Sequence, residues 1–236
     1  MHRSAKRLAS LLACAAVPVM LVAGCSGSDS EGSGDSASSD TSGKAGSPSP
    51  TVAAAKYKKL PNPCEAFSKD TVKKLLPKAK DESGERGKSN DNSAHGTCAW
   101  NSSDAQGVDG TQFRWLDIGY QRYDSEASLG SGEQRAREFY GKQVAGAKTA
   151  EGAKKVKTVQ SSGTGDEATS VTYDLKKDDN DFKNTTVIAR TANIVVTLNY
   201  NGAGLAGGDT PKSDDLLKKA QAAAKEAVTA VIKANS

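Results

Sequence analysis

Histidine is almost absent from this sequence, which has two in 236 residues, His2 and His95. His2 lies in a stretch that we interpret below as a cleaved leader, so His95 stands alone, in a polar segment just before Cys98. A zinc site or a Ser-His-Asp triad needs more than one isolated histidine in a polar loop. We therefore predict no metal site and no catalytic residues of these types, and we interpret His95 as a surface group.

The chain also lacks a strong excess of either charge. Its 32 Lys and Arg residues stand against 28 Asp and Glu residues, a formal net charge of +4. Removal of residues 1–24 takes away Arg3, Lys6 and Arg7 and no acidic residue, so the net charge of the remainder is close to +1. Proteins that bind nucleic acids usually carry a basic patch or stripe. The sequence shows none, and we predict no nucleic-acid partner.

The apolar run from Leu8 to Ala23 is too short for an ordinary membrane span and is interrupted by Pro18. A basic segment precedes it, as in a secretory signal. The run ends in Val22-Ala23-Gly24-Cys25, which resembles a bacterial lipobox. In lipoproteins with this pattern, the cysteine receives a diacylglyceryl group, with acyl chains such as palmitate, and becomes the first residue after cleavage. We predict a signal peptide over 1–24 and lipidation of Cys25; the alternative is an ordinary signal peptide that ends near a cysteine.

Residues 26–50 contain almost no side chain that could join a hydrophobic core. Fifteen of these 25 residues are Ser or Gly. Such a segment cannot bury enough apolar surface to offset the entropy of ordering it. We predict a flexible tether over 25–59, which begins at the lipidated Cys25 and holds a folded domain, residues 60–236, away from the membrane.

Four cysteines are present, and the predicted signal peptide and lipidation site leave two of them free to form a disulfide. Cys14 leaves with the signal peptide and Cys25 carries lipid, so Cys64 and Cys98 remain. An exported protein lies in a disulfide-permissive compartment, and no C-x-x-C redox motif is present. We predict a structural disulfide between Cys64 and Cys98.

The hydrophobic pattern of residues 60–236 predicts an α+β fold in one domain. Apolar residues at helical spacing indicate three helices, and alternating patterns indicate strands that cluster as hairpins, which is typical of an antiparallel sheet. The turn at residues 191–193 predicts one such hairpin. The predicted helices lie in 62–80, where Pro77 ends the helix, in 131–148 and in 214–234, and the predicted strands are 97–101, 111–123, 168–175, 185–190 and 193–200.

A G-x-G-x-x-G motif is formed by Gly202, Gly204 and Gly207 after the last predicted strand. A dinucleotide-binding loop of this kind opens a helix directly and is followed by another strand that carries an acidic residue. Here Thr210 and Pro211 separate the glycines from the helix, and no strand follows that helix in this sequence. We predict a flexible connection between strand and helix, and no cofactor.

Two short motifs in the predicted domain resemble those of a known family. Asn62-Pro63-Cys64 opens the first helix and Cys98-Ala99-Trp100 lies in the first strand. With the signal peptide, lipobox and tether, they resemble the actinomycete cell-envelope lipoproteins grouped as domain of unknown function 3558. The resemblance implies an extracytoplasmic lipoprotein with an α+β domain, and it implies no catalytic residues because the family has no settled activity.

We therefore expect a protein of the cell membrane, anchored by lipid, that faces away from the cytoplasm. Its domain would bind an envelope protein or a small-molecule ligand without catalysing a reaction. Aromatic side chains are the commonest anchors of binding surfaces. The candidates are Trp100, Trp115, Tyr120 and Tyr123, although each could instead belong to the core.

Two other functions are open at this point. A cell-envelope hydrolase or wall-modifying enzyme would use a pair of carboxylates. Asp117, Asp166 and Glu167 are candidates, and the sequence does not reveal whether any two of them meet. A purely structural or assembly role would need no pocket.

Overall fold

The structure, a computed structural model, describes residues 52–236. The predicted signal peptide, the lipidation site Cys25 and most of the predicted tether lie outside these residues. The strands are β1 (Glu85–Arg86), β2 (His95–Ala105), β3 (Thr111–Arg122), β4 (Lys154–Gln160), β5 (Glu167–Lys177), β6 (Asn180–Thr191) and β7 (Ile194–Leu205). The helices are α1 (Lys69–Leu75), α2 (Gly132–Lys148) and α3 (Ser213–Ala234), with 3-10 turns at Pro63–Glu65 and Gly107–Asp109.

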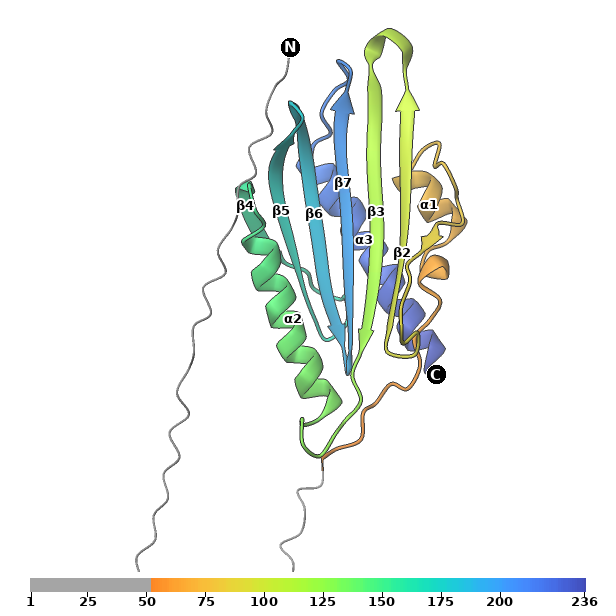
Figure 1. Ribbon diagram of the computed structural model, residues 1–236, viewed down its shortest axis with the longest axis vertical. Coiled ribbons are helices and arrows are strands. Elements are labelled where there is room, and N and C mark those ends of the chain that lie inside the picture. Colours follow the sequence, from red (N-terminus) through yellow and green to blue (C-terminus); the bar gives the residue numbers. More distant parts are fainter. Residues whose placement is uncertain (1–51) are drawn as a thin grey trace, which may run out of the picture. The chain divides into compact units, whose positions relative to one another are not determined.

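The seven strands form one antiparallel sheet in the order β1-β2-β3-β7-β6-β5-β4 (Figure 1). The predicted fold class, an antiparallel sheet packed with about three helices, is confirmed. Among the described residues, no helix is long and apolar enough to span a membrane.

Helix α3 covers one face of the sheet, which we call the α3 face. Side chains of a strand alternate between its two faces, and in β7 the residues Ile194, Val196, Leu198 and Tyr200 point to the α3 face and are fully buried. They meet an apolar stripe of α3 made of Leu216, Ala220, Ala223, Ala224, Ala227, Val228 and Val231. This large cluster is the core that the alternation of residues 193–200 predicted.

Helix α2 lies on the opposite face, which we call the α2 face, and covers only part of it (Figure 1). The Ser131 hydroxyl caps the helix by accepting a hydrogen bond from the Gln134 amide at 3.2 Å. Ala136 and Tyr140 then pack on Ile188 and Val195 in a second, smaller cluster. Helix α2 packs mainly on β5, β6 and β7 and reaches only a small part of β3, so that most of the α2 face of β2 and β3 carries no helix among the described residues.

The packed part of the chain begins before residue 60, where the sequence placed the end of the tether. Ala55 and Tyr57 are buried. The Asn193 side chain accepts a hydrogen bond from the Tyr57 amide at 2.8 Å and donates one to its carbonyl at 2.9 Å. Asn235 makes the same pair of bonds with the backbone of Lys59. The predicted boundary between tether and domain, at residue 60, is therefore several residues too late. Two asparagines distant in sequence bind the backbone of residues 57–59, and the side chains of this segment show no hydrophobic pattern that would reveal it.

Two local predictions also need correction. The helix predicted from residue 62 to Pro77 is split into the Pro63–Glu65 turn and α1, because the Ser68 hydroxyl caps a new helix by accepting from the Thr71 amide. Strand β4 was missed because all seven of its residues are exposed, so that it shows no alternation. Its lysines suit an edge strand, where they hinder pairing with another chain.

The glycine motif is not a flexible connection. Gly202 and Gly204 lie inside β7, and Gly207 alone is in the turn, with φ of +88°. A Cβ atom at Gly204 would lie 2.1 Å from the carbonyl oxygen of Gly208. Glycine is therefore required at position 204 because the backbone after β7 folds back over the end of that strand.

Candidate functional site

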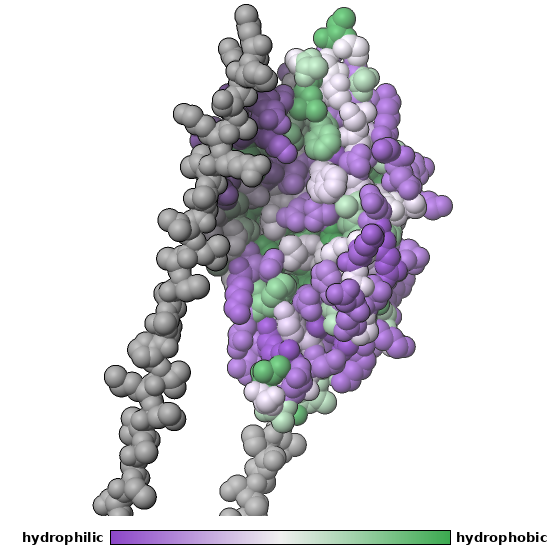
Figure 2. Space-filling model, in the orientation of Figure 1, coloured by the Kyte–Doolittle hydropathy of each residue, from purple (hydrophilic) through white to green (hydrophobic). Residues whose placement is uncertain are grey.

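A groove of about 270 Å³ lies between α2 and the uncovered part of the α2 face. Helix α2 forms one wall, and β2, β3 and β7 form the floor. Hydrophilic and hydrophobic residues are interspersed on this side of the molecule (Figure 2). The groove is lined by His95 and Thr97 of β2, Asp117, Gly119, Tyr120 and Gln121 of β3, Val195 and Thr197 of β7, and Phe139 and Gln143 of α2.

The depth of the groove depends on Gly119 and on the register of three strands. Gly119 lies opposite Thr97 on β2 and opposite Thr197 on β7. A Cβ atom at Gly119 would lie 3.6 Å from the Cγ2 atom of Thr97, which is an ordinary contact. The backbone therefore does not need glycine here, and the absence of a side chain leaves space between two short threonines.

Asp117 is held at the edge of this groove by neutral hydrogen-bond donors. Its Oδ1 accepts from Asn199 Nδ2 at 2.9 Å, and its Oδ2 accepts from Trp115 Nε1 at 2.8 Å. The Thr186 hydroxyl donates to the side-chain Oδ1 of Asn199 at 2.7 Å, which fixes the orientation of that side-chain amide. No Lys, Arg or His nitrogen within residues 52–236 lies within 4.0 Å of the Asp117 carboxylate.

Burial raises the pKa of Asp117 above its ordinary value, and the two hydrogen bonds to the carboxylate oppose part of that rise. The group is thus partly desolvated but keeps a fixed orientation. A carboxylate has about four lone-pair positions, of which two are used here. Asp117 can therefore accept further hydrogen bonds from a molecule in the groove.

The four candidate binding aromatics do not form one surface. Trp115 is half-buried on the α2 face, and Tyr123 packs against the Phe139 ring with 5.7 Å between centroids. Trp100 is 1% exposed and Tyr120 is 0% exposed, both in the core on the α3 face. The interpretation of Trp100 and Tyr120 as binding residues is wrong, because both side chains point to the α3 face: the Trp100 ring lies 5.5 Å from the Phe67 ring and the Tyr120 hydroxyl donates to the Ala227 carbonyl of α3 at 3.3 Å. Tyr120 therefore borders the groove on the opposite face without presenting its ring to it.

The three carboxylates that the hydrolase alternative requires do not form a catalytic pair, because neither Asp166 nor Glu167 lies beside Asp117. Arg190 holds both Asp166, at 3.1 Å, and Glu167. Glu167 lies on β5, three strand spacings from Asp117 on β3, which amounts to about 14 Å. The two carboxylates of glycosidases are roughly 5 to 9.5 Å apart. Asp166 and Glu167 are instead the anionic partners of a buried arginine.

Several groove residues were missed or misjudged from the sequence. His95 was interpreted as a surface group, but it is half-buried and lines the groove opposite Gln121. The alternation of side chains along β3 was sufficient to predict that Asp117, Gly119 and Gln121 share one face of the sheet. Nothing local could have placed Gln143 of α2 beside them. Within residues 52–236 no three His, Cys, Asp or Glu side chains are grouped so that they could hold a metal ion.

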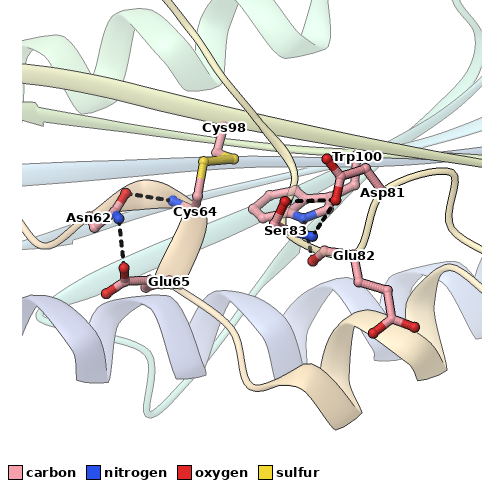
Figure 3. Close-up of a disulfide and its surroundings, with 8 residues drawn as sticks. All are labelled: Asn62, Cys64, Glu65, Asp81, Glu82, Ser83, Cys98 and Trp100. Carbon is pink, nitrogen blue, oxygen red and sulfur yellow. Dashed lines mark hydrogen bonds between the residues drawn. A yellow bond between two sulfur atoms is a disulfide. The ribbon is translucent and has the colours of Figure 1, made fainter.

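Cys64 and Cys98 form a disulfide with 5.2 Å between their Cα atoms, as predicted (Figure 3). Asn62 accepts a hydrogen bond from the Cys64 amide at 3.2 Å, which starts the 3-10 turn that carries the cysteine. Next to Cys98 on the same face, Trp100 donates to the carbonyl oxygen of Glu82 at 3.2 Å. The disulfide thus holds the segment before α1 against β2, on the side of the sheet opposite the groove.

Comparison with known proteins places the chain in a family. The model of the family described as protein of unknown function (DUF3558) matches residues 20–199. The chain belongs to this family. Membership in DUF3558 confirms the resemblance that the motifs around Cys64 and Cys98 indicated.

The other comparisons add little to the DUF3558 assignment. No relative is found among the curated proteins. Among solved structures, the chain is similar to the crystal structure of LpqN, involved in cell envelope biogenesis of Mycobacterium tuberculosis, at 12% identity and a TM-score of 0.28. The match covers 46% of this chain and 60% of the LpqN chain. A similarity this low supports no argument about fold or function.

Proposed function

We propose that this protein is a lipid-anchored module of the cell membrane, facing away from the cytoplasm, that binds a small ligand or a partner protein in the groove beside α2. Its anchor would be Cys25, and the segment after Cys25 would hold the domain away from the membrane. The lipobox-like sequence supports the anchor. The Cys64–Cys98 disulfide supports an oxidising compartment, because such bonds are rare in the cytosol.

The observation that carries the binding proposal is the state of Asp117 beside an open groove. Its carboxylate is partly buried, oriented by Trp115 and Asn199, and has no cationic partner among the described residues. A desolvated carboxylate without a counter-charge destabilises a fold, so such groups are usually paired or serve a function. We infer that the occupant of the groove presents hydrogen-bond donors, such as hydroxyl or ammonium groups, to Asp117.

The anchor is tested by incorporation of labelled palmitate in cells. Cys25→Ala should abolish labelling, because it removes the only thiol that the lipobox presents. Cys14→Ala is the matched control, since it changes a cysteine within the predicted signal peptide and should leave labelling intact. Labelling that persists in Cys25→Ala would contradict a lipid anchor at this residue.

The groove is tested by photo-crosslinking in intact cells. A photoreactive residue at Gln143, on the α2 wall, should give a discrete adduct. The same residue at Lys218, on the exposed side of α3, should not give it. Gly119→Leu fills the groove without requiring a left-handed backbone and should abolish the adduct. An adduct that is equally strong at both positions, or that survives Gly119→Leu, would count against the groove as the binding site.

A further inference from the structure

A second cavity, of about 220 Å³, lies on the α3 face near the turn between β2 and β3. It is separate from the groove beside α2, which lies on the opposite face. The cavity is lined by Pro77, Ser102, Asp104, Gln106, Gln112 and Arg114. All but the proline are polar, which is unusual for the face of the sheet that carries the main core.

Arg114 brings an unbalanced positive charge to this cavity. Its Nη1 donates to the carbonyl oxygen of Phe113 at 2.6 Å and to that of Ala203 at 3.5 Å, and its Nη2 donates to Gln112 Oε1 at 3.0 Å. A guanidinium has five N–H donors, so donors are left over for a ligand. No carboxylate within residues 52–236 lies within 4.0 Å of Arg114.

The acidic residue in the cavity does not neutralise this charge. Asp104 forms an ion pair with Lys78 at 2.7 Å, and this pairing lowers the pKa of the Asp104 carboxyl. Lys78 and Asp104 therefore cancel each other. Arg114 keeps one net positive charge in a half-buried position, where charge is only weakly screened by solvent.

Ser102 supplies a second, independent indication of a ligand. It lies directly opposite Arg114 across the β2–β3 pair and is 1% exposed. Its hydroxyl has no hydrogen-bond partner among the described residues. A buried polar group without a partner costs free energy, and native structures usually satisfy such groups.

The glycines of β7 provide the space in which the Arg114 side chain lies. Gly202 is opposite Arg114, and a Cβ atom there would lie 3.0 Å from Arg114 Cδ. Gln112, which accepts from Arg114, also donates to the carbonyl oxygen of Asp209 at 2.9 Å. The chain that folds back over Gly204 thus helps to fix the guanidinium beside the cavity.

We propose that this cavity binds a small oxyanion, a carboxylate or a phosphate, through the Arg114 guanidinium and the Ser102 hydroxyl. Arginine is well suited to this because its planar fork matches the oxygens of both groups. Cavities that hold drug-sized ligands measure about 300 to 1,000 Å³. The volume of this cavity therefore restricts the ligand to a few heavy atoms beyond the anionic group and excludes a nucleotide.

The test uses the full chain purified in detergent and isothermal titration with acetate, succinate and inorganic phosphate at constant ionic strength. At least one anion should bind saturably, and the one that binds most tightly shows whether the ligand is a carboxylate or a phosphate. Glycerol, which offers hydroxyls without charge, should not bind. An absence of saturable binding by all three anions would overturn the proposal and leave a cavity filled by water.

Three variants assign the binding to this cavity. Arg114→Gln should weaken it about tenfold to a hundredfold, and Ser102→Ala severalfold, because hydrogen bonds to charged groups are the stronger ones. Arg86→Gln is the matched control, since Arg86 is an exposed arginine away from the cavity, and it should bind like the unchanged protein. Equal binding by Arg114→Gln would overturn the proposal.

Loss of folding is distinguished from loss of binding by two measurements. The thermal unfolding midpoint of each variant without anion reports whether the variant folds. In the unchanged protein, the Nε–H resonance of Arg114, assigned by its absence in Arg114→Gln, should shift with the same saturation curve as the titration. An Arg114 resonance that does not respond to a saturating anion would show that the anion binds elsewhere.

Discussion

Replacing Gly204 with alanine tests most directly why this chain carries a G-x-G-x-x-G motif. The new Cβ atom would lie 2.1 Å from the carbonyl oxygen of Gly208 and 2.5 Å from that of Asp209. Both are backbone atoms, and the Asp209 carbonyl is bound to Gln112, so relief requires the returning chain to move. Overpacking of this kind costs typically 1–3 kcal/mol, and we expect about 3 kcal/mol of lost stability.

The other two glycines of the motif should be less sensitive, for different reasons. At Gly202 the nearest atoms to a new Cβ are side-chain carbons of Arg114 and Pro211, both at 3.0 Å. Small side-chain shifts can relieve this contact, so Gly202→Ala should cost about 1 kcal/mol or less. Gly207 has open space around it but a positive φ of +88°, and Gly207→Ala should cost about 1 kcal/mol from backbone strain alone.

Gly141 offers a control with the opposite sign. It lies on the exposed side of α2, and a Cβ atom there would meet nothing within 4 Å. Alanine is favoured over glycine in a helix by roughly 0.5–1 kcal/mol, so Gly141→Ala should stabilise the protein. Urea denaturation followed by circular dichroism measures all four variants. A neutral or stabilising effect of Gly204→Ala would contradict the close approach of the Gly208 and Asp209 backbone to β7.

Three further predictions concern stability. Replacing both Cys64 and Cys98 with alanine should remove about 4 kcal/mol, because the bond closes a separation of 34 residues; a loss below about 1 kcal/mol in urea denaturation would contradict this. Asn193→Ala should cost about 2–4 kcal/mol and speed amide exchange at Tyr57, since it leaves buried backbone groups unpaired; unchanged exchange would disprove the anchoring. Because the pKa of Asp117 is raised above its ordinary 3.8, the folded state binds the proton more tightly, so stability should fall as pH rises from about 3.8 through the folded pKa. A carboxyl-carbon NMR titration midpoint below 3.8 would reverse that sign.

Much of the fold could be predicted from the sequence because the deciding forces are local. The alternation from Ile194 to Tyr200 determines which side chains of β7 face the core, and the stripe through Ala220 and Val228 determines the buried side of α3. The cap at Ser131 is equally local, since its hydroxyl bonds an amide three residues away. The predicted disulfide required only that two cysteines remain after the N-terminal segment is interpreted.

The positions of edges and termini were harder to predict for a physical reason. Strand β4 is exposed on all its residues, so burial imposes no pattern on its sequence. Residues 55–59 are held by Asn193 and Asn235, which lie more than a hundred residues away. A backbone that is bound by distant side chains leaves no periodicity in its own sequence.

The sequence alone determined the kind of fold, the two core-facing patterns and the pair of cysteines, because each depends on neighbours along the chain. Only the tertiary structure decided that β3 lies beside β7, and this pairing brings Asp117 next to Asn199 and Arg114 next to Gly202. The same arrangement kept Asp166 and Glu167 at Arg190, away from Asp117. Both the groove and the arginine cavity are made by registers between strands distant in sequence, and such registers are set by packing across the whole sheet.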